Sequence, residues 1–127
     1  METIIQEGSL KTPEIKVDNE KGIISLRGRS NPENSNEYYR PLMNWLDEYI
    51  LKPAPVTSVE VNLEHFNTSS SKCLLDMLKK IKKLFESGRE CRISWYYEDD
   101  DEEMLETAEI FESMTGLKIE KIGVPEA

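Results

Sequence analysis

The sequence lacks the residues and segments on which several large classes of protein depend. Only two cysteines, Cys73 and Cys91, occur among its 127 residues, and they lie far apart in the chain. There is no C-x-x-C motif and no cluster of cysteine and histidine, so zinc-binding spacing is absent. Nothing marks the chain as secreted, and a disulfide framework is therefore not expected.

The sequence also has no long apolar run, no signal-peptide pattern and no excess of positive charge. No hydrophobic run approaches the roughly 20 residues that span a membrane, and the N-terminus METIIQEGSLKTPE has no basic region before an apolar core. Lys and Arg number 16 against 25 Asp and Glu, which gives a formal net charge of −9. Because phosphate contacts need clustered Lys and Arg, we expect neither nucleic-acid nor membrane partners. We expect a reduced, cytoplasmic protein, open to protein partners.

The patterns that are present predict one α/β domain over residues 1–127. Strand and helix patterns alternate in the order β-β-α-β-α-β-α-β, and residues 1–12 are expected to be either flexible or an extra N-terminal strand. Such alternation implies parallel crossovers. However, the strands themselves alternate apolar and polar residues, whereas a sheet covered on both faces has continuous apolar strands. We therefore expect a mixed sheet with helices packed mainly on one face. The expected strands are 14–17, 23–28, 56–66, 91–97 and 117–122, and the expected helices are 37–50, a helix after the hydroxyl stretch, and 102–114.

Helical and strand spacing also predicts the core. In the second helix the expected inward residues are Leu74, Met77, Leu78, Ile81, Leu84 and Phe85. In the third they are Leu105, Ala108, Phe111 and Met114. Trp45, Trp95 and Cys73 fall on apolar faces and are expected inside.

The stretch NTSSS, residues 67–71, lies between an expected strand and an expected helix. Asn, Ser and Thr are preferred N-cap residues, and capping alone is the simpler interpretation, although one such residue suffices. A hydroxyl at the carboxyl edge of a sheet is also well placed for modification. A phosphate adds about −1.5 to −2 charges near the positive end of the helix dipole, where the charge is tolerated. At a protein interface the same charge costs several kcal/mol unless a cation meets it.

Three segments of the chain resemble the SiaC-type regulatory phosphoproteins of bacteria. They are GRSNPENSNEYYRPLMNWLDEY, VNLEHFNTSSSKCLLDML and ISWYYEDDDEEMLETAEIFE. The resemblance covers about residues 13–122, and its most specific pieces are Pro32-Glu33-Asn34-Ser35 and Asn67-Thr68-Ser69-Ser70. It implies a STAS-like fold, since these proteins are similar to STAS-domain anti-sigma-factor antagonists.

The resemblance further implies a non-enzymatic partner switch without a cofactor. A serine/threonine kinase would phosphorylate Thr68, and a PP2C-type phosphatase would remove the phosphate. Ser69 is the second choice of acceptor, because the broader STAS proteins usually carry a serine at this junction. The unphosphorylated form would engage an output protein, in known cases a diguanylate cyclase that controls biofilm formation through cyclic di-GMP. A conventional anti-sigma-factor antagonist that regulates transcription is the alternative.

A partner surface is expected at the edge of the sheet where the strands before RSNPENS and NTSSSK end. For the first of these segments, a plain helix cap made by Asn34 with Glu37 is an equally good interpretation. The expected partner-binding residues are Arg29, Pro32, Glu33, Asn34, Ser35, His65, Asn67, Thr68, Ser69, Ser70 and Lys72.

Two other features have simple interpretations. The run EDDDEE, residues 98–103, has no EF-hand spacing and is most simply a solvated helix start, although it could contribute to the same edge. His65 could serve a small hydrolase as the base for Thr68 or Ser69, but the chain has no G-x-S-x-G motif. We therefore expect no catalytic residue and no metal site.

Overall fold

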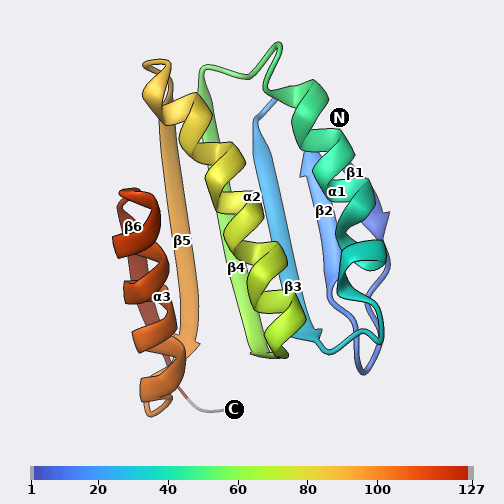
Figure 1. The fold of residues 1–127 in the computed structure, drawn as a ribbon, viewed down its shortest axis with the longest axis vertical. Helices are drawn as coiled ribbons and strands as arrows, with labels where there is room; N and C mark the ends of the chain where they lie inside the picture. Colours follow the sequence, from blue (N-terminus) through green and yellow to red (C-terminus); the bar gives the residue numbers. More distant parts are fainter. Residues whose placement is uncertain (1, 126–127) are drawn as a thin grey trace.

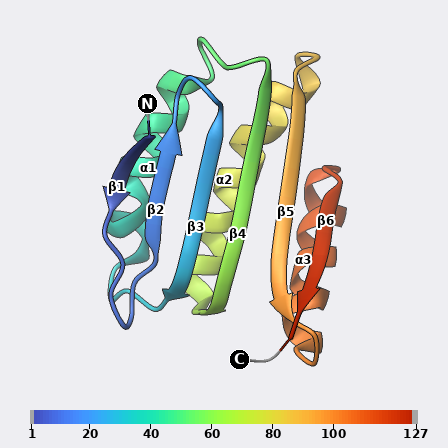
Figure 2. The same ribbon diagram turned by 180° about the vertical axis from the view of Figure 1, so that it is seen from behind.

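One six-stranded sheet with three helices on one of its faces forms the computed structural model, which describes residues 2–125 (Figures 1 and 2). The strands follow one another across the sheet in chain order, from β1 to β6. The elements are β1 (Glu2–Gln6), β2 (Glu14–Asp18), β3 (Ile23–Ser30), α1 (Ser35–Tyr49), β4 (Val56–Phe66), α2 (Thr68–Glu86), β5 (Glu90–Glu98), α3 (Glu102–Thr115) and β6 (Ile119–Val124).

The sheet is mixed, as expected from the sequence. β1, β2 and β3 are antiparallel neighbours, whereas β3, β4, β5 and β6 run parallel. Each parallel connection crosses over through one helix, and all three helices cover the same face. In β4, Val59 and Val61 are buried under the helices, while Glu60 and Asn62 are exposed on the open face. Within the N-terminal segment, Glu2–Gln6 form an additional strand, β1.

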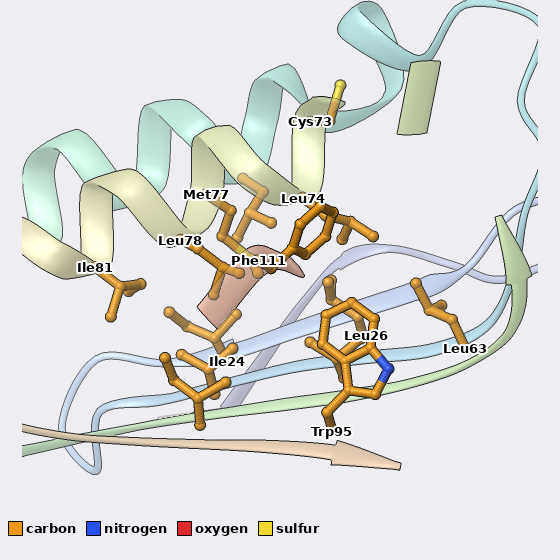
Figure 3. Close-up of a cluster of buried hydrophobic side chains, with 14 of the residues drawn as sticks. Ile24, Leu26, Leu63, Cys73, Leu74, Met77, Leu78, Ile81, Trp95 and Phe111 are labelled. Atoms are coloured by element: carbon orange, nitrogen blue, oxygen red, sulfur yellow. The ribbon is translucent and has the colours of Figure 1, made fainter. Parts of the chain in front are cut away.

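The core lies between α2 and the middle of the sheet (Figure 3). Leu74, Met77 and Ile81 of α2 are fully buried, and burial of such a side chain contributes about 1.5–3 kcal/mol. Trp95 of β5 is also fully buried, and the rings of Phe66 and Phe111 make edge-on contacts with it at centroid distances of 6.1 and 5.7 Å. The burial expected for Leu74, Met77, Ile81 and Trp95 is therefore confirmed.

Two residues expected in the core lie outside it. Phe85 is 52% exposed and Met114 is 57% exposed. Leu84 packs into a second small cluster with Tyr49 of α1, which leaves Phe85, about 100° further around the helix, on the outside. In α3 the buried stripe ends on Thr115, so Met114 faces solvent.

β4 extends beyond its pairing with β5, and this arrangement shapes the carboxyl edge of the sheet. The β4–β5 pairing ends at Val61 and Trp95, whereas β4 continues to Phe66 with β3 as its partner. Figure 2 shows the two strands separating toward this end. The end of β4 is therefore joined closely to the end of β3, and the acidic segment after β5 stands further along the edge.

Candidate functional site

Both helices that begin at the joined ends of β3 and β4 are capped by asparagine. Asn67 precedes α2, and its Oδ1 accepts the N–H of Ser70 at 2.9 Å. Asn34 precedes α1, and its Oδ1 accepts the N–H of Glu37 at 3.1 Å. The capping interpretation of Asn34 and Glu37 is confirmed. Because Asn67 caps α2, the side-chain hydroxyls of residues 68–71 are not required for that task.

The two junctions are held side by side, as parallel strands predict. The N–H of Asn67 donates to the carbonyl oxygen of Ser30 at 2.9 Å, and its side-chain Nδ2 donates to the carbonyl oxygen of Pro32 at 3.3 Å. One asparagine thus caps α2 and fastens the loop that leads into α1. The segments 29–35 and 67–70, far apart in the sequence, form one surface.

Beneath this surface lies a row of buried hydroxyl groups. Ser30 Oγ donates to Ser70 Oγ at 2.7 Å, and Ser70 Oγ donates to the carbonyl oxygen of Ser30 at 3.1 Å. Since Ser30 has a single hydroxyl hydrogen, Tyr39 must be the donor in its 2.6 Å contact with Ser30 Oγ. Burial raises the pKa of Tyr39 far above its usual value, so the phenol keeps its proton.

Ser35 and Ser69 extend this row to the surface. Ser35 Oγ lies 3.1 Å from Ser70 Oγ and 2.7 Å from Ser69 Oγ. Ser69 Oγ also lies 3.2 Å from Oδ1 of Asn67, an oxygen that can accept its hydrogen. Ser70 is fully buried and Ser35 is 2% exposed, whereas Ser69 is an exposed residue whose hydroxyl turns inward. We call Tyr39, Ser30, Ser70, Ser35 and Ser69 the hydroxyl network.

Thr68 stands apart from the hydroxyl network. It is the first residue of α2, it is exposed, and no hydrogen bond to its hydroxyl is found among residues 2–125. The first backbone N–H groups of a helix and its dipole both favour negative charge at this position. Lys72, exposed one helical turn later, lies at the spacing at which helix side chains meet.

The expected partner-binding residues differ in their exposure. Pro32, Ser35 and Ser70 are buried, so their side chains support the surface from below and cannot themselves contact a partner. Asn67 is half-buried. The exposed members are Arg29, Glu33, Asn34, His65, Thr68, Ser69 and Lys72.

His65 does not have the contacts that a hydrolase would need. Its Nδ1 lies 3.1 Å from Oδ1 of Asn31, and no hydrogen bond joins it to Thr68 or Ser69 in the described part of the chain. A serine or threonine nucleophile needs its base within hydrogen-bond reach. The geometry therefore gives no support to the hydrolase alternative.

The acidic run begins α3. Asp101 is the N-cap of this helix, and its Oδ1 accepts the N–H of Met104 at 3.0 Å. Glu102 and Glu103 occupy the first turn, where negative charge is favourable. No group of three or more His, Cys, Asp or Glu side chains within residues 2–125 is arranged to hold a metal ion.

Sequence reasoning did not find Ser30 or Tyr39. Ser30 follows Ile24, Leu26 and Gly28 at alternate positions of β3, so strand alternation places it on the core face. A hydroxyl at such a position needs a buried partner, which is the signal that could have revealed it.

Comparison with known proteins identifies the family. The model of the SiaC family regulatory phosphoproteins matches residues 5–124, nearly the whole chain. The chain belongs to the SiaC family. The resemblance seen in its sequence motifs is thereby confirmed.

Relatives and solved structures from Pseudomonas aeruginosa agree with this assignment. An uncharacterized protein of strain UCBPP-PA14 is 31% identical over 104 residues, which are 82% of each chain. Apo-SiaC matches with a TM-score of 0.83 and 26% identity over 97% of this chain and 99% of that one. The structure of the diguanylate cyclase SiaD in complex with its activator SiaC matches with a TM-score of 0.86 and 27% identity, covering 92% of this chain and 96% of that one.

No helix in the described part of the chain is long and apolar enough to cross a membrane.

In a member of a family of regulatory phosphoproteins, the edge of the sheet around Thr68 is the candidate site. There a free hydroxyl, a helix N-terminus and a row of exposed side chains meet at one place.

Proposed function

We propose that this SiaC-family protein is a non-enzymatic partner switch of the cytoplasm, controlled by reversible phosphorylation of Thr68. A serine/threonine kinase adds the phosphate and a PP2C-type phosphatase removes it. The unphosphorylated form binds and activates an output protein of the diguanylate cyclase class. One observation carries the proposal: the Thr68 hydroxyl is exposed and unbonded among the described residues, whereas those of Ser69 and Ser70 are engaged in the hydroxyl network.

The isolated protein tolerates a phosphate at this place. A phosphothreonine carries about −1.5 to −2 charges at neutral pH. At Thr68 this charge lies within the first turn of α2, where N–H groups and the helix dipole offset it. Lys72 supplies a cation one turn further on. Phosphorylation therefore leaves the fold intact.

A bound partner changes this balance. Where the surface around Thr68 is covered, the phosphate becomes a buried charge, at a cost of several kcal/mol unless the partner offers a cation. Arg29, on the neighbouring strand, is already paired with Glu64 at 3.0 Å. A loss of about 2.7 kcal/mol weakens binding about a hundredfold. One modification thus separates the bound and free states without refolding.

The class of output protein rests on the similarity to the SiaC that activates SiaD. That structure matches 92% of this chain. A diguanylate cyclase as partner places the switch in cyclic di-GMP signalling and in the control of biofilm formation.

The test combines phosphate mapping with cyclase binding. The purified chain is treated with the serine/threonine kinase and Mg-ATP, and peptide mapping locates the phosphate. Binding to a diguanylate cyclase of the SiaD type and production of cyclic di-GMP are then measured. We expect phosphate on Thr68, binding weakened by about a hundredfold or more, and no response of Thr68→Ala to the kinase.

Thr68→Glu, which places a negative charge at the same position, should also weaken cyclase binding. Ser113→Glu is its matched control, since Ser113 is exposed on α3 and outside the proposed surface. The control should bind the cyclase as the wild type does. Phosphate at another residue, or cyclase binding that phosphate leaves unchanged, contradicts the proposal. Turnover of ester substrates that His65→Ala abolishes would show an enzyme instead, and binding to an anti-sigma factor in place of a cyclase would redirect the output.

A further inference from the structure

We infer that Ser35 selects the phosphorylation acceptor by holding the hydroxyl of Ser69 inside the hydroxyl network. Ser69 is then a latent second acceptor that the fold silences, and Thr68 is left as the one the kinase can use. This inference rests on the proposed function, because it concerns the choice between two adjacent residues of the same modification site.

The two residues differ in bonding and not in their position in the chain. Thr68 and Ser69 are consecutive, both are exposed, and both lie in the first turn of α2. Ser69 Oγ lies 2.7 Å from Ser35 Oγ and 3.2 Å from Oδ1 of Asn67. The Thr68 hydroxyl has no such contact within residues 2–125. The shorter of the two contacts that distinguish Ser69 therefore comes from α1.

The hydrogen positions fix Ser69 further. Ser35 has one hydroxyl hydrogen. If Ser35 donates it to Ser69, then Ser69 donates its own to Asn67. If Ser35 instead donates to Ser70, at 3.1 Å, or to Oδ1 of Asn67, at 3.4 Å, then Ser69 donates to Ser35 or to Asn67. In every arrangement the hydrogen of Ser69 is directed into the protein and away from solvent.

Phosphoryl transfer needs the opposite arrangement. The hydroxyl oxygen forms a bond to the γ-phosphorus of ATP as the bond to the ADP oxygen breaks, and its proton passes to the base of the kinase. The oxygen must therefore be approachable in line, with its hydrogen facing the enzyme. At Ser69 the approach is occupied by Ser35, which is 2% exposed, and by the cap residue Asn67. At Thr68 the approach is open.

Ser35 touches none of the reacting atoms of Thr68 and acts as a positioning residue. Its removal should free Ser69 to rotate outward. Ser70→Ala is the matched control, because it deletes an equally buried hydroxyl of the same network and leaves the hydrogen bond between Ser35 and Ser69 in place. Each change deletes one buried hydroxyl, but only Ser35→Ala is predicted to affect Ser69.

The experiment uses full-length chains in a Thr68→Ala background, to which Ser35→Ala or Ser70→Ala is added. Each is incubated with Mg-ATP and the kinase that phosphorylates the wild type, and peptide mapping locates the phosphate. Loss of one buried hydrogen bond changes a population by about tenfold. We expect at least about that increase of phosphate on Ser69 with Ser35→Ala and none with Ser70→Ala. A further Ser69→Ala change should remove the added phosphate.

The outcomes separate this inference from the proposed function. Wild-type chain without phosphate on Thr68 overturns both. Phosphate on Thr68 of the wild type, combined with equal labelling of Ser69 in the presence and absence of Ser35→Ala, overturns only the role of Ser35. If Ser69 is already phosphorylated efficiently in the Thr68→Ala variant, without any change at Ser35, the role of Ser35 is also overturned. Circular dichroism and thermal unfolding check each fold, and Ser35→Cys, which keeps the side-chain size and weakens the donor, replaces an unfolded Ser35→Ala.

Discussion

At each end of the sheet a buried tyrosine hydroxyl contacts another hydroxyl group, yet the proposed site lies at only one of the two ends. At the amino end of β4, Tyr49 Oη lies 2.9 Å from Oγ1 of Thr57 and accepts the N–H of Ala54 at 3.1 Å. At the carboxyl end, Tyr39 donates to Ser30 at 2.6 Å. The chemistry is the same. At the amino end Thr57 is fully buried, whereas at the carboxyl end the chain of hydroxyls continues to the surface.

The amino end is also enclosed by its surroundings. Trp45 stacks on Tyr49 with ring centroids 4.7 Å apart, and Gly22 bonds to Ser58 through its carbonyl oxygen at 2.7 Å. No such cover lies over Thr68 at the carboxyl end. Packing on all sides thus makes Thr57 structural, whereas the exposed Thr68, beside a row of hydroxyls that ends at solvent, is free for the proposed modification.

The largest effect on stability is expected at the amino end, from Gly22→Ala. Gly22 has φ +69°, and an added Cβ would lie closer to the carbonyl oxygen of Val56 and to Oη of Tyr49 than real Cβ atoms approach. Gly116 has φ +76° with open space around it and serves as the control. Denaturant unfolding should show a loss of about 3 kcal/mol or more for Gly22→Ala and about 1 kcal/mol for Gly116→Ala. Equal losses would show that the enclosure of Gly22 contributes nothing.

The two tyrosines give the next effect. Tyr49→Phe leaves the N–H of Ala54 and the hydroxyl of Thr57 buried without this partner, and we expect a loss of about 2 kcal/mol in unfolding free energy. Tyr39→Phe removes only a donor to Ser30, whose own hydrogen still goes to Ser70, so about 1 kcal/mol is expected. The same unfolding measurement compares both. A larger loss of unfolding free energy for Tyr39→Phe than for Tyr49→Phe would show that the tyrosine at the carboxyl end contributes more to stability, contrary to this expectation.

Much of the fold followed from patterns local to one element. Alternation in β4 and helical spacing through Leu74, Met77 and Ile81 predicted which faces are buried, because those periods are set by the backbone itself. The neighbourhood of residues 29–35 and 67–70 followed from the rule that parallel strands end at one edge.

The inner part of the site could not be predicted in this way. Whether Ser69 or Thr68 is engaged depends on Ser35 and Ser30, which lie more than 30 residues earlier and are brought close by the tertiary register. Which residue is buried near the end of a helix also depends on tertiary packing. Met114 lies outside because the neighbouring position, Thr115, takes the buried place, which helical spacing alone does not decide.

A smaller effect concerns the phosphorylated carboxyl end. Lys72 lies four residues after Thr68 on α2, so a phosphate on Thr68 should form an exposed ion pair with it. Lys72→Gln should lower the unfolding free energy of the phosphorylated protein by about 1 kcal/mol and that of the unphosphorylated protein by much less. Lys79→Gln, exposed two turns further along the helix, is the control. An equal loss of unfolding free energy in the phosphorylated and unphosphorylated proteins would show that Lys72 does not contact the phosphate.

The smallest effect is the pH dependence of stability that arises from Glu112, which lies outside the hydroxyl network. Glu112 of α3 accepts from Nζ of Lys121 at 2.7 Å and from the N–H of Ile119, at the start of β6, at 2.7 Å. The bond from Lys121, followed by that from Ile119, lowers the pKa of Glu112 below its ordinary value of 4.5. A carboxyl group with a lowered pKa stabilises the fold above its unfolded-state pKa, and this contribution is lost as the pH falls through the folded value.

The wild type should therefore lose about 0.5 kcal/mol more unfolding free energy than Glu112→Gln between about pH 6 and about pH 3. Glu109→Gln, exposed on the same helix, should follow the wild type. The hydroxyl network has no group that titrates in this range, since serine does not ionise and the pKa of Tyr39 is raised. Ser70→Ala, introduced into the wild type or into Glu112→Gln, should therefore change the unfolding free energy by the same amount throughout this pH range. A pH-dependent shift would mean that the two regions are coupled and that the carboxyl end is not the independent unit on which a switch at Thr68 depends.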